Sequence, residues 1–203
     1  MSVNLQKGQK VSLVKSDGSK LTKMMVGLGW DAIAPEEKGG FFSKIFGGGK
    51  KDFDCDASVF ICKDGKLTSV DDIVYFGNLE HKSGAVKHMG DNLTGEGDGD
   101  DEEIFVDLNQ IPAAYDKLIF VVNIYKAVER KQTFGNIKNA FIRIIDNDTD
   151  EELCRYNLSG GDYDGMLAMV VGEVYRNKND WKFNAIGNGT KDPGLQEISR
   201  RFS

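Results

Sequence analysis

The sequence predicts an all-β fold, a β-sandwich of two mainly antiparallel sheets with few short helices. About ten short segments have the continuous apolar or alternating pattern of strands. Frequent glycine, asparagine and aspartate turns separate these segments, and helix signals are few. This combination is typical of a sandwich, and a chain of 203 residues with a 40% apolar fraction suffices for one domain with a sizeable core.

The expected strands differ in how deeply their residues should be buried. Residues 118–125 are almost continuously apolar, which favours a strand covered on both faces. Residues 104–108 alternate and favour a strand with one buried face. An Asp-Gly pair predicts a tight turn at residues 63–66. The other expected strands cover residues 10–15, 23–30, 57–63, 72–76, 139–145, 152–158, 166–175 and 181–186.

Two segments are the best candidates for helices. Residues 127–132 combine apolar and charged side chains and predict a short surface helix. Residues 193–202 predict a C-terminal helix, with Asp192 as the N-cap and Pro193 at the first helical position.

Charge and composition exclude several classes of protein. The net charge of −6 argues against a nucleic-acid-binding protein, which needs a basic surface. The chain lacks a run of roughly 18 apolar residues that could span a membrane. The first residues lack the apolar region of a signal peptide, so we expect a cytoplasmic protein.

The cysteines and histidines do not form a zinc or redox motif. Cys55, Cys62 and Cys154 are an odd, scattered set, which favours reduced thiols in a cytosolic protein. His81 and His88 have no partners at zinc-ligand spacing, so we expect them on the surface or in loops.

The chemistry of the chain is concentrated in one acidic stretch, residues 90–103. Seven of the residues from Asp91 to Glu103 are acidic and none is basic. Such a loop repels itself unless a cation or a basic partner neutralises it. Its carboxylates, amide and carbonyl groups are hard oxygen ligands suited to Ca²⁺ or Mg²⁺. We therefore expect a divalent cation site.

A single acidic loop does not easily supply the 6–8 oxygens that Ca²⁺ takes. The segment from Asp52 to Asp56 is the best second contributor, because its aspartates alternate with apolar residues and share one side of an extended chain. Asp31, just after Trp30, is a further candidate ligand.

Other interpretations of the acidic segments remain open. The stretch can be a solvated acidic loop without metal. It is not an EF-hand, because its glycines and acids have a different spacing. Residues 146–151 also fail the EF-hand pattern, and turn-residue preferences favour a hairpin turn there. The aspartates at 162 and 164 remain ambiguous.

Several motifs together resemble the TerD family of tellurium-resistance and stress proteins. They are Val26-Gly27-Leu28-Gly29-Trp30-Asp31, Asp52-Phe53-Asp54-Cys55-Asp56-Ala57-Ser58, the acidic stretch from Gly90 to Glu102, Thr133-Phe134-Gly135, Ala140-Phe141-Ile142-Arg143, Gly172-Glu173-Val174-Tyr175-Arg176 and Trp181-Lys182-Phe183. The resemblance covers nearly the whole chain, and the long acidic motif makes it specific.

The resemblance implies a β-sandwich with Ca²⁺ bound in adjacent loop sites. It also implies a role in tellurite resistance and stress protection, with other Ter proteins as partners in a membrane-associated assembly. Matched to this sequence, together with Asp31, the candidate metal ligands are Asp31, Asp54, Asp56, Asp91, Asn92, Thr94, Gly95, Asp98, Asp100, Asp101 and Glu102.

The chain departs from the family pattern in a glycine-rich segment at about residues 35–51, which we expect to be a flexible insertion in a single domain covering residues 1–203. Its aromatic and lysine side chains leave a docking role open. We expect a non-enzymatic, calcium-binding scaffold module without nucleic-acid partners. Calcium-dependent membrane docking, at the inner face of the membrane, is the first alternative. A metal-dependent hydrolase is the second, and it lacks a nucleophile–base motif.

Overall fold

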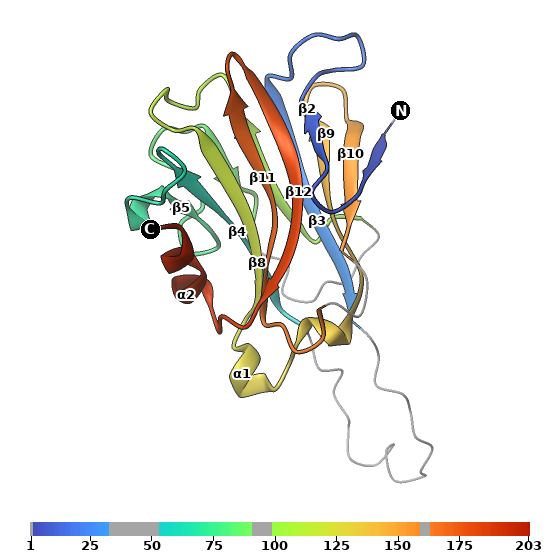
Figure 1. The fold of residues 1–203 in the computed structure, drawn as a ribbon, viewed down its shortest axis with the longest axis vertical. Helices are drawn as coiled ribbons and strands as arrows, with labels where there is room; N and C mark the ends of the chain where they lie inside the picture. The colour runs from blue at the N-terminus through green and yellow to red at the C-terminus, as the bar shows by residue number, and fades with distance from the viewer. Residues whose placement is uncertain (1, 33–52, 91–98, 159–162) are drawn as a thin grey trace.

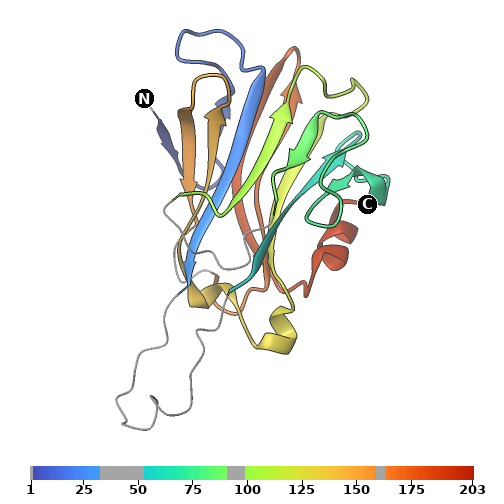
Figure 2. The ribbon, with the colours of Figure 1, turned by 180° about the vertical axis from the view of Figure 1, so that it is seen from behind.

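Two packed β-sheets form the body of the protein (Figure 1 and Figure 2). The computed structural model describes residues 2–32, 53–90, 99–158 and 163–203. Within these residues each sheet has six strands. The first sheet has the order β1 (Val3–Leu5), β10 (Glu151–Asn157), β9 (Ile137–Asp146), β3 (Lys23–Ala32), β7 (Glu102–Asp107) and β6 (Val86–His88). The second has the order β2 (Lys10–Ser12), β12 (Asp180–Thr190), β11 (Ala168–Asn177), β8 (Lys117–Ile124), β4 (Cys55–Cys62) and β5 (Ile73–Val74).

The predicted fold class is confirmed. All of these strand pairs are antiparallel except β1 with β10, whose register places Val3 beside Cys154. The expected turn at residues 63–66 is also present, because Lys63 and Lys66 form a β-bridge and Asp64 and Gly65 between them have positive φ angles.

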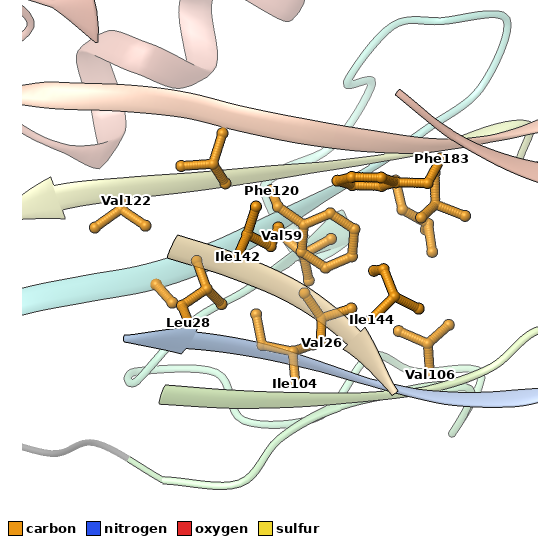
Figure 3. Packing of buried hydrophobic residues seen from close by; sticks show 14 of the residues in the cluster. Val26, Leu28, Val59, Ile104, Val106, Phe120, Val122, Ile142, Ile144 and Phe183 are labelled. Carbon is orange, nitrogen blue, oxygen red and sulfur yellow. The ribbon is translucent and has the colours of Figure 1, made fainter. Parts of the chain in front are cut away.

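The core lies between the two sheets and follows the period-2 alternation of the strands. Val26 of β3 and Ile144 of β9 point inward from the first sheet and face Phe120 and Phe183 of the second (Figure 3). A second, smaller apolar layer covers the outer face of the second sheet, where Ile198 packs among side chains of β4, β8 and β11.

Sequence reasoning missed two strands and made a third too long. β1 and β6 have three residues each, too few to show a clear alternation. β5 has only two residues because a turn of 3-10 helix, Val70–Asp72, occupies the beginning of the expected strand.

The two expected helices exist but are short. α1 spans Ala127–Arg130 and α2 spans Leu195–Ser199, with turns of 3-10 helix at Phe134–Asn136 and Arg200–Phe202. The predicted N-cap was wrong: Gly194 precedes α2. The Asp192 carboxylate instead accepts hydrogen bonds from the Thr190 hydroxyl and the Arg201 guanidinium. Among the described helices, none is long and apolar enough to cross a membrane.

His81 lies in a loop, as expected, but His88 lies in β6, and neither histidine is on the surface. His81 and His88 are 1% and 4% exposed. Each lies beside a buried carboxylate: Nε2 of His81 is 3.2 Å from Asp72, and Nε2 of His88 is 2.7 Å from Glu102. A buried imidazole needs such a polar partner, and these acids are distant enough in sequence to escape pattern analysis.

All three cysteines are free and buried, which predicts slow reaction with thiol reagents. Burial raises the pKa of Cys62 and of Cys154 to about 12, so at pH 8 the reactive thiolate fraction is on the order of 10⁻⁴. We expect the aromatic disulfide reagent DTNB to label the native protein very slowly, and to label all three thiols after unfolding in guanidinium. Rapid labelling of one thiol without denaturant would contradict this burial.

Candidate metal centre

The two acidic segments meet at one end of the sandwich. β3 ends and β4 begins there, and α1 lies at the same end, low in Figure 1. The pKa of Cys55, the first residue of β4, is affected by acids of both segments. Burial raises the pKa of its thiol well above 9.0, and repulsion from Asp56, Asp54, Asp101 and Glu102 raises it further. Carboxylates from both segments therefore lie near one buried thiol.

Asp100 lies on the outer face of the first sheet, above Gly27. A Cβ atom at Gly27 would collide with the Asp100 carboxylate, so the sheet needs glycine at this point. The Arg143 guanidinium donates two hydrogen bonds to this carboxylate, from Nε to Oδ1 at 2.8 Å and from Nη2 to Oδ2 at 2.9 Å. Arg143 thus neutralises Asp100 in a bidentate pair that fixes its orientation.

Asp101 forms hydrogen bonds to β3 through both its backbone and its side chain. Its N–H donates to the Leu28 carbonyl at 2.8 Å, and its Oδ2 accepts the Trp30 N–H at 2.8 Å. Burial raises the pKa of Asp101; the Trp30 hydrogen bond opposes this, and repulsion from Asp31 and Asp100 adds to it. Asp101 therefore lies where negative charge accumulates.

Glu102 points into the sandwich, away from Asp100. It pairs with Leu28 of β3 in the same register that places Ile104 beside Val26, so its side chain shares their inward face. Its side chain is 1% exposed, and its Oε2 lies 2.7 Å from Nε2 of His88. Glu102 is thus part of a buried carboxylate–imidazole pair.

The candidates of the second segment and Asp31 also contact polar neighbours. Oδ2 of Asp54 lies 3.3 Å from Nη1 of Arg130. Oδ2 of Asp56 accepts a hydrogen bond from the Asn123 amide at 3.2 Å. Oδ2 of Asp31 accepts one from Asn139 at 2.7 Å. Five of the predicted ligands lie outside the described residues, namely Asp91, Asn92, Thr94, Gly95 and Asp98. The glycine-rich segment at about residues 35–51 also lies outside them.

The described acids match Ca²⁺ in chemistry but not in number. Carboxylate oxygens are the donors that this ion prefers. Within the described ranges, however, no three His, Cys, Asp or Glu side chains gather closely enough to hold a metal ion. Asp100 and Glu102 point to opposite faces of the first sheet. The described residues alone therefore do not form a complete calcium site.

Sequence reasoning found the carboxylates but missed their partners: Asn123, Arg130, Asn139, Arg143 and His88. One signal was available for Arg143. It is the single charged residue between Ala140 and Ile145, in a strand that is otherwise apolar there, and such a residue needs an acidic neighbour. The separation of 43 residues between Arg143 and Asp100 hid the identity of that neighbour.

Comparisons with known proteins agree with this architecture. Residues 1–202 match the model of the TerD domain. The chain is 50% identical over 202 residues to stress response protein SCP2 of Bacillus subtilis (strain 168), covering 100% of both chains. It is 43% identical over 203 residues to tellurium resistance protein TerD of Serratia marcescens, covering 100% of this chain and 97% of that protein.

A solved structure shares the fold at low sequence identity. It is a homologue of telluride resistance protein (TerD) from Streptomyces coelicolor A3(2), with a TM-score of 0.64 and 19% identity. The superposition covers 90% of this chain and 98% of the other. The full-length family match and the identity to named members lead to one conclusion: the chain belongs to the TerD family, whose named members include tellurium-resistance and stress-response proteins.

Proposed function

We propose that this chain is a calcium-binding stress protein that acts as a binding or scaffold module in tellurite resistance and the general stress response. The family relationship supports the physiological role. The accumulation of negative charge around Asp101, beside Asp31 and Asp100, supports the cation site. On this proposal, donors from residues 91–98 complete the ligand set that the described carboxylates leave incomplete.

We propose that the protein is cytoplasmic and works through partners, among them other Ter proteins, at the inner face of the membrane. This proposal is supported by the basic side chains of α1 and of the residue before it, which lie at the acidic end of the sandwich. Arg130 reaches across to Asp54, and the exposed Lys126 lies over the Tyr125 ring. A cation that neutralises the carboxylates would leave these basic groups to face an anionic partner.

An enzymatic role is not part of the proposal. His81 contacts both Asp72 and the Ser83 hydroxyl, an order that resembles an acid–base–nucleophile series. The Ser83 hydroxyl, however, accepts the Ala85 N–H within the same turn, and His81 is 1% exposed. The contacts among Asp72, His81 and Ser83 therefore hold this turn against the edge of the second sheet.

Calcium titration tests the proposal. We expect isothermal calorimetry to detect saturable Ca²⁺ binding, and thermal unfolding to shift upward with Ca²⁺, because a ligand that binds only the folded state stabilises it. Asp101→Asn should weaken Ca²⁺ binding by about tenfold or more, since it removes a central charge from the site.

Asp150→Asn is the matched control for this experiment. Asp150 is exposed in the turn between β9 and β10, and its positive φ of 56° is well tolerated by asparagine. Its substitution removes the same charge and should leave the affinity unchanged. If Ca²⁺ produces no binding heat and no thermal stabilisation of the unmodified protein, the calcium proposal is wrong. Equal losses in both variants would show a general charge effect instead of a site at Asp101.

A further inference from the structure

A hollow of about 590 Å³ opens on the outer face of the second sheet, beside the segment that follows α2. Two features of β12 create it. The β11–β12 register shifts between Val170 and Gly172, so that β12 carries one extra residue, a β-bulge at Ile186 and Gly187. Gly187 has a φ of 59°, and the bulge draws its backbone inward, against the Tyr156 hydroxyl. Residues before and after the bulge then line a concave surface.

The floor of the hollow is apolar. Val170 is 6% exposed, and Ile186 and Phe202 pack against the small apolar layer that includes Val170. The Phe202 ring is itself held by Phe60, at a centroid distance of 5.7 Å. These side chains offer a fixed apolar surface suited to a flat apolar group.

Two basic side chains, Lys7 and Arg201, line the hollow. Arg201 is oriented by Asp192, which accepts hydrogen bonds from its Nε and Nη2 atoms. This pair uses two of the five guanidinium N–H groups and leaves three for a ligand. Lys7 lines the hollow too, and among the described residues it forms no ion pair. Because Asp192 offsets Arg201, Lys7 gives the rim a net positive charge in a protein of net charge −6.

Further hydrogen-bonding groups surround the same floor. The Asn188 side chain is exposed at the rim, and the Tyr163 hydroxyl lies at the wall, where it donates to the Gly187 carbonyl at 3.2 Å. A cavity of this size with an apolar floor and a few polar groups has the general build of a small-molecule site.

We propose that this hollow binds a small organic anion with a flat apolar body. The apolar body lies on Val170, Ile186 and Phe202, and the anionic group lies between the Lys7 ammonium and the remaining guanidinium N–H groups of Arg201. Neither the proposed calcium site nor its acidic residues take part, so this site is independent of the proposed function.

An NMR titration of the full chain tests the site, with naphthalenesulfonate as an anionic probe and naphthalenemethanol as its neutral analogue. We expect saturable shifts of the amide signals of Gly187, Asn188 and Gly189, and about tenfold tighter binding of the sulfonate than of the alcohol. Lys7→Glu should abolish that preference and retain binding of the alcohol. Lys7→Gln, which removes the charge without reversing it, should give an intermediate preference.

Lys178→Glu is the matched control, because Lys178 is exposed in the turn between β11 and β12 and the change alters net charge equally. It should leave the preference for the sulfonate intact. The site is overturned if neither probe binds saturably, if the shifted amides lie elsewhere, or if sulfonate and alcohol bind the unmodified protein equally. Equal effects of Lys7→Glu and Lys178→Glu would also overturn it, since they would reflect net charge alone.

Discussion

Arg143→Ala should destabilise the protein by about 3 kcal/mol, because it leaves the Asp100 carboxylate buried without its positive partner. The Asp100 side chain is 2% exposed and the Arg143 side chain 25%, so water can replace the guanidinium only in part. For a domain of this size the loss corresponds to a fall of roughly 10 °C in Tm. Urea unfolding followed by circular dichroism would measure it.

Two further variants separate the buried charge from other effects of Arg143. Arg155→Ala removes a neighbouring guanidinium that contacts Glu152 and the Phe141 ring but not Asp100, and it should cost about 1 kcal/mol or less. Adding Asp100→Asn to Arg143→Ala should recover part of the loss, because the uncompensated charge is then absent. If Arg143→Ala costs no more than Arg155→Ala, the bidentate pair does not have the role that its geometry indicates.

Asp72→Ala should cost about 3 kcal/mol, since Asp72 is the buried centre of a polar cluster. Its Oδ1 atom is 2.8 Å from the Lys82 ammonium, 2.8 Å from the Tyr115 hydroxyl and 3.2 Å from Nε2 of His81. The cluster joins the turn before β5 to the turn before β6 and to the segment before β8. Its loss leaves two buried side chains, His81 and Tyr115, without this partner. Asp71→Asn, at the exposed neighbouring position, should change the unfolding free energy by no more than about 0.5 kcal/mol.

The same carboxylate predicts a dependence of stability on pH. Burial alone would raise the pKa of Asp72, but hydrogen bonds from Lys82, Tyr115 and His81 outweigh it and hold the pKa below the ordinary 3.8. A carboxyl whose pKa is lowered by folding stabilises the protein above its unfolded pKa. That contribution is lost as the pH falls through the lower, folded pKa. The stability difference between the unmodified protein and Asp72→Asn should therefore be constant above about pH 5 and shrink below 3.8. A constant difference down to pH 2 would contradict this assignment.

The fold was predictable because its strong signals are local. The middle of β8, residues 118–122, is continuously apolar, and β7 alternates, so each of these strands shows its burial within its own residues. β1 and β6 have no such signal, because three residues pair only through partners that lie elsewhere in the chain. Asp192 shows a different limit. Its position before a proline favoured an N-cap, but Arg201 and Thr190 compete for the same carboxylate.

The sequence indicated which acids to consider as metal ligands, and the metal site itself stays a prediction. Alternation and composition selected the acids, and the need for more oxygen donors led to the expectation that Asp54 and Asp56 approach the acidic stretch. In the structure the carboxylates of Asp54, Asp56 and Asp101 all lie near Cys55. Which face each acid occupies depends on strand register. Register turns Glu102 toward His88 and leaves Asp100 above Gly27. The alternation of Ile104 and Val106 predicts that Glu102 points inward, but Asp100 precedes the strand, so no alternation predicts where its side chain lies.

The pairing of β1 with β10 and of β2 with β12 constrains the order in which the molecule can be completed during synthesis. Val3 pairs with Cys154 in one sheet, and Val11 pairs with Phe183 in the other. Both N-terminal strands are thus edge strands whose partners lie far along the sequence. Native pairing of both edges must wait until β10 and β12 have been synthesised, and such long-range contacts are formed slowly. Each sheet therefore gains one of its edge strands only after a partner that is distant in sequence is available.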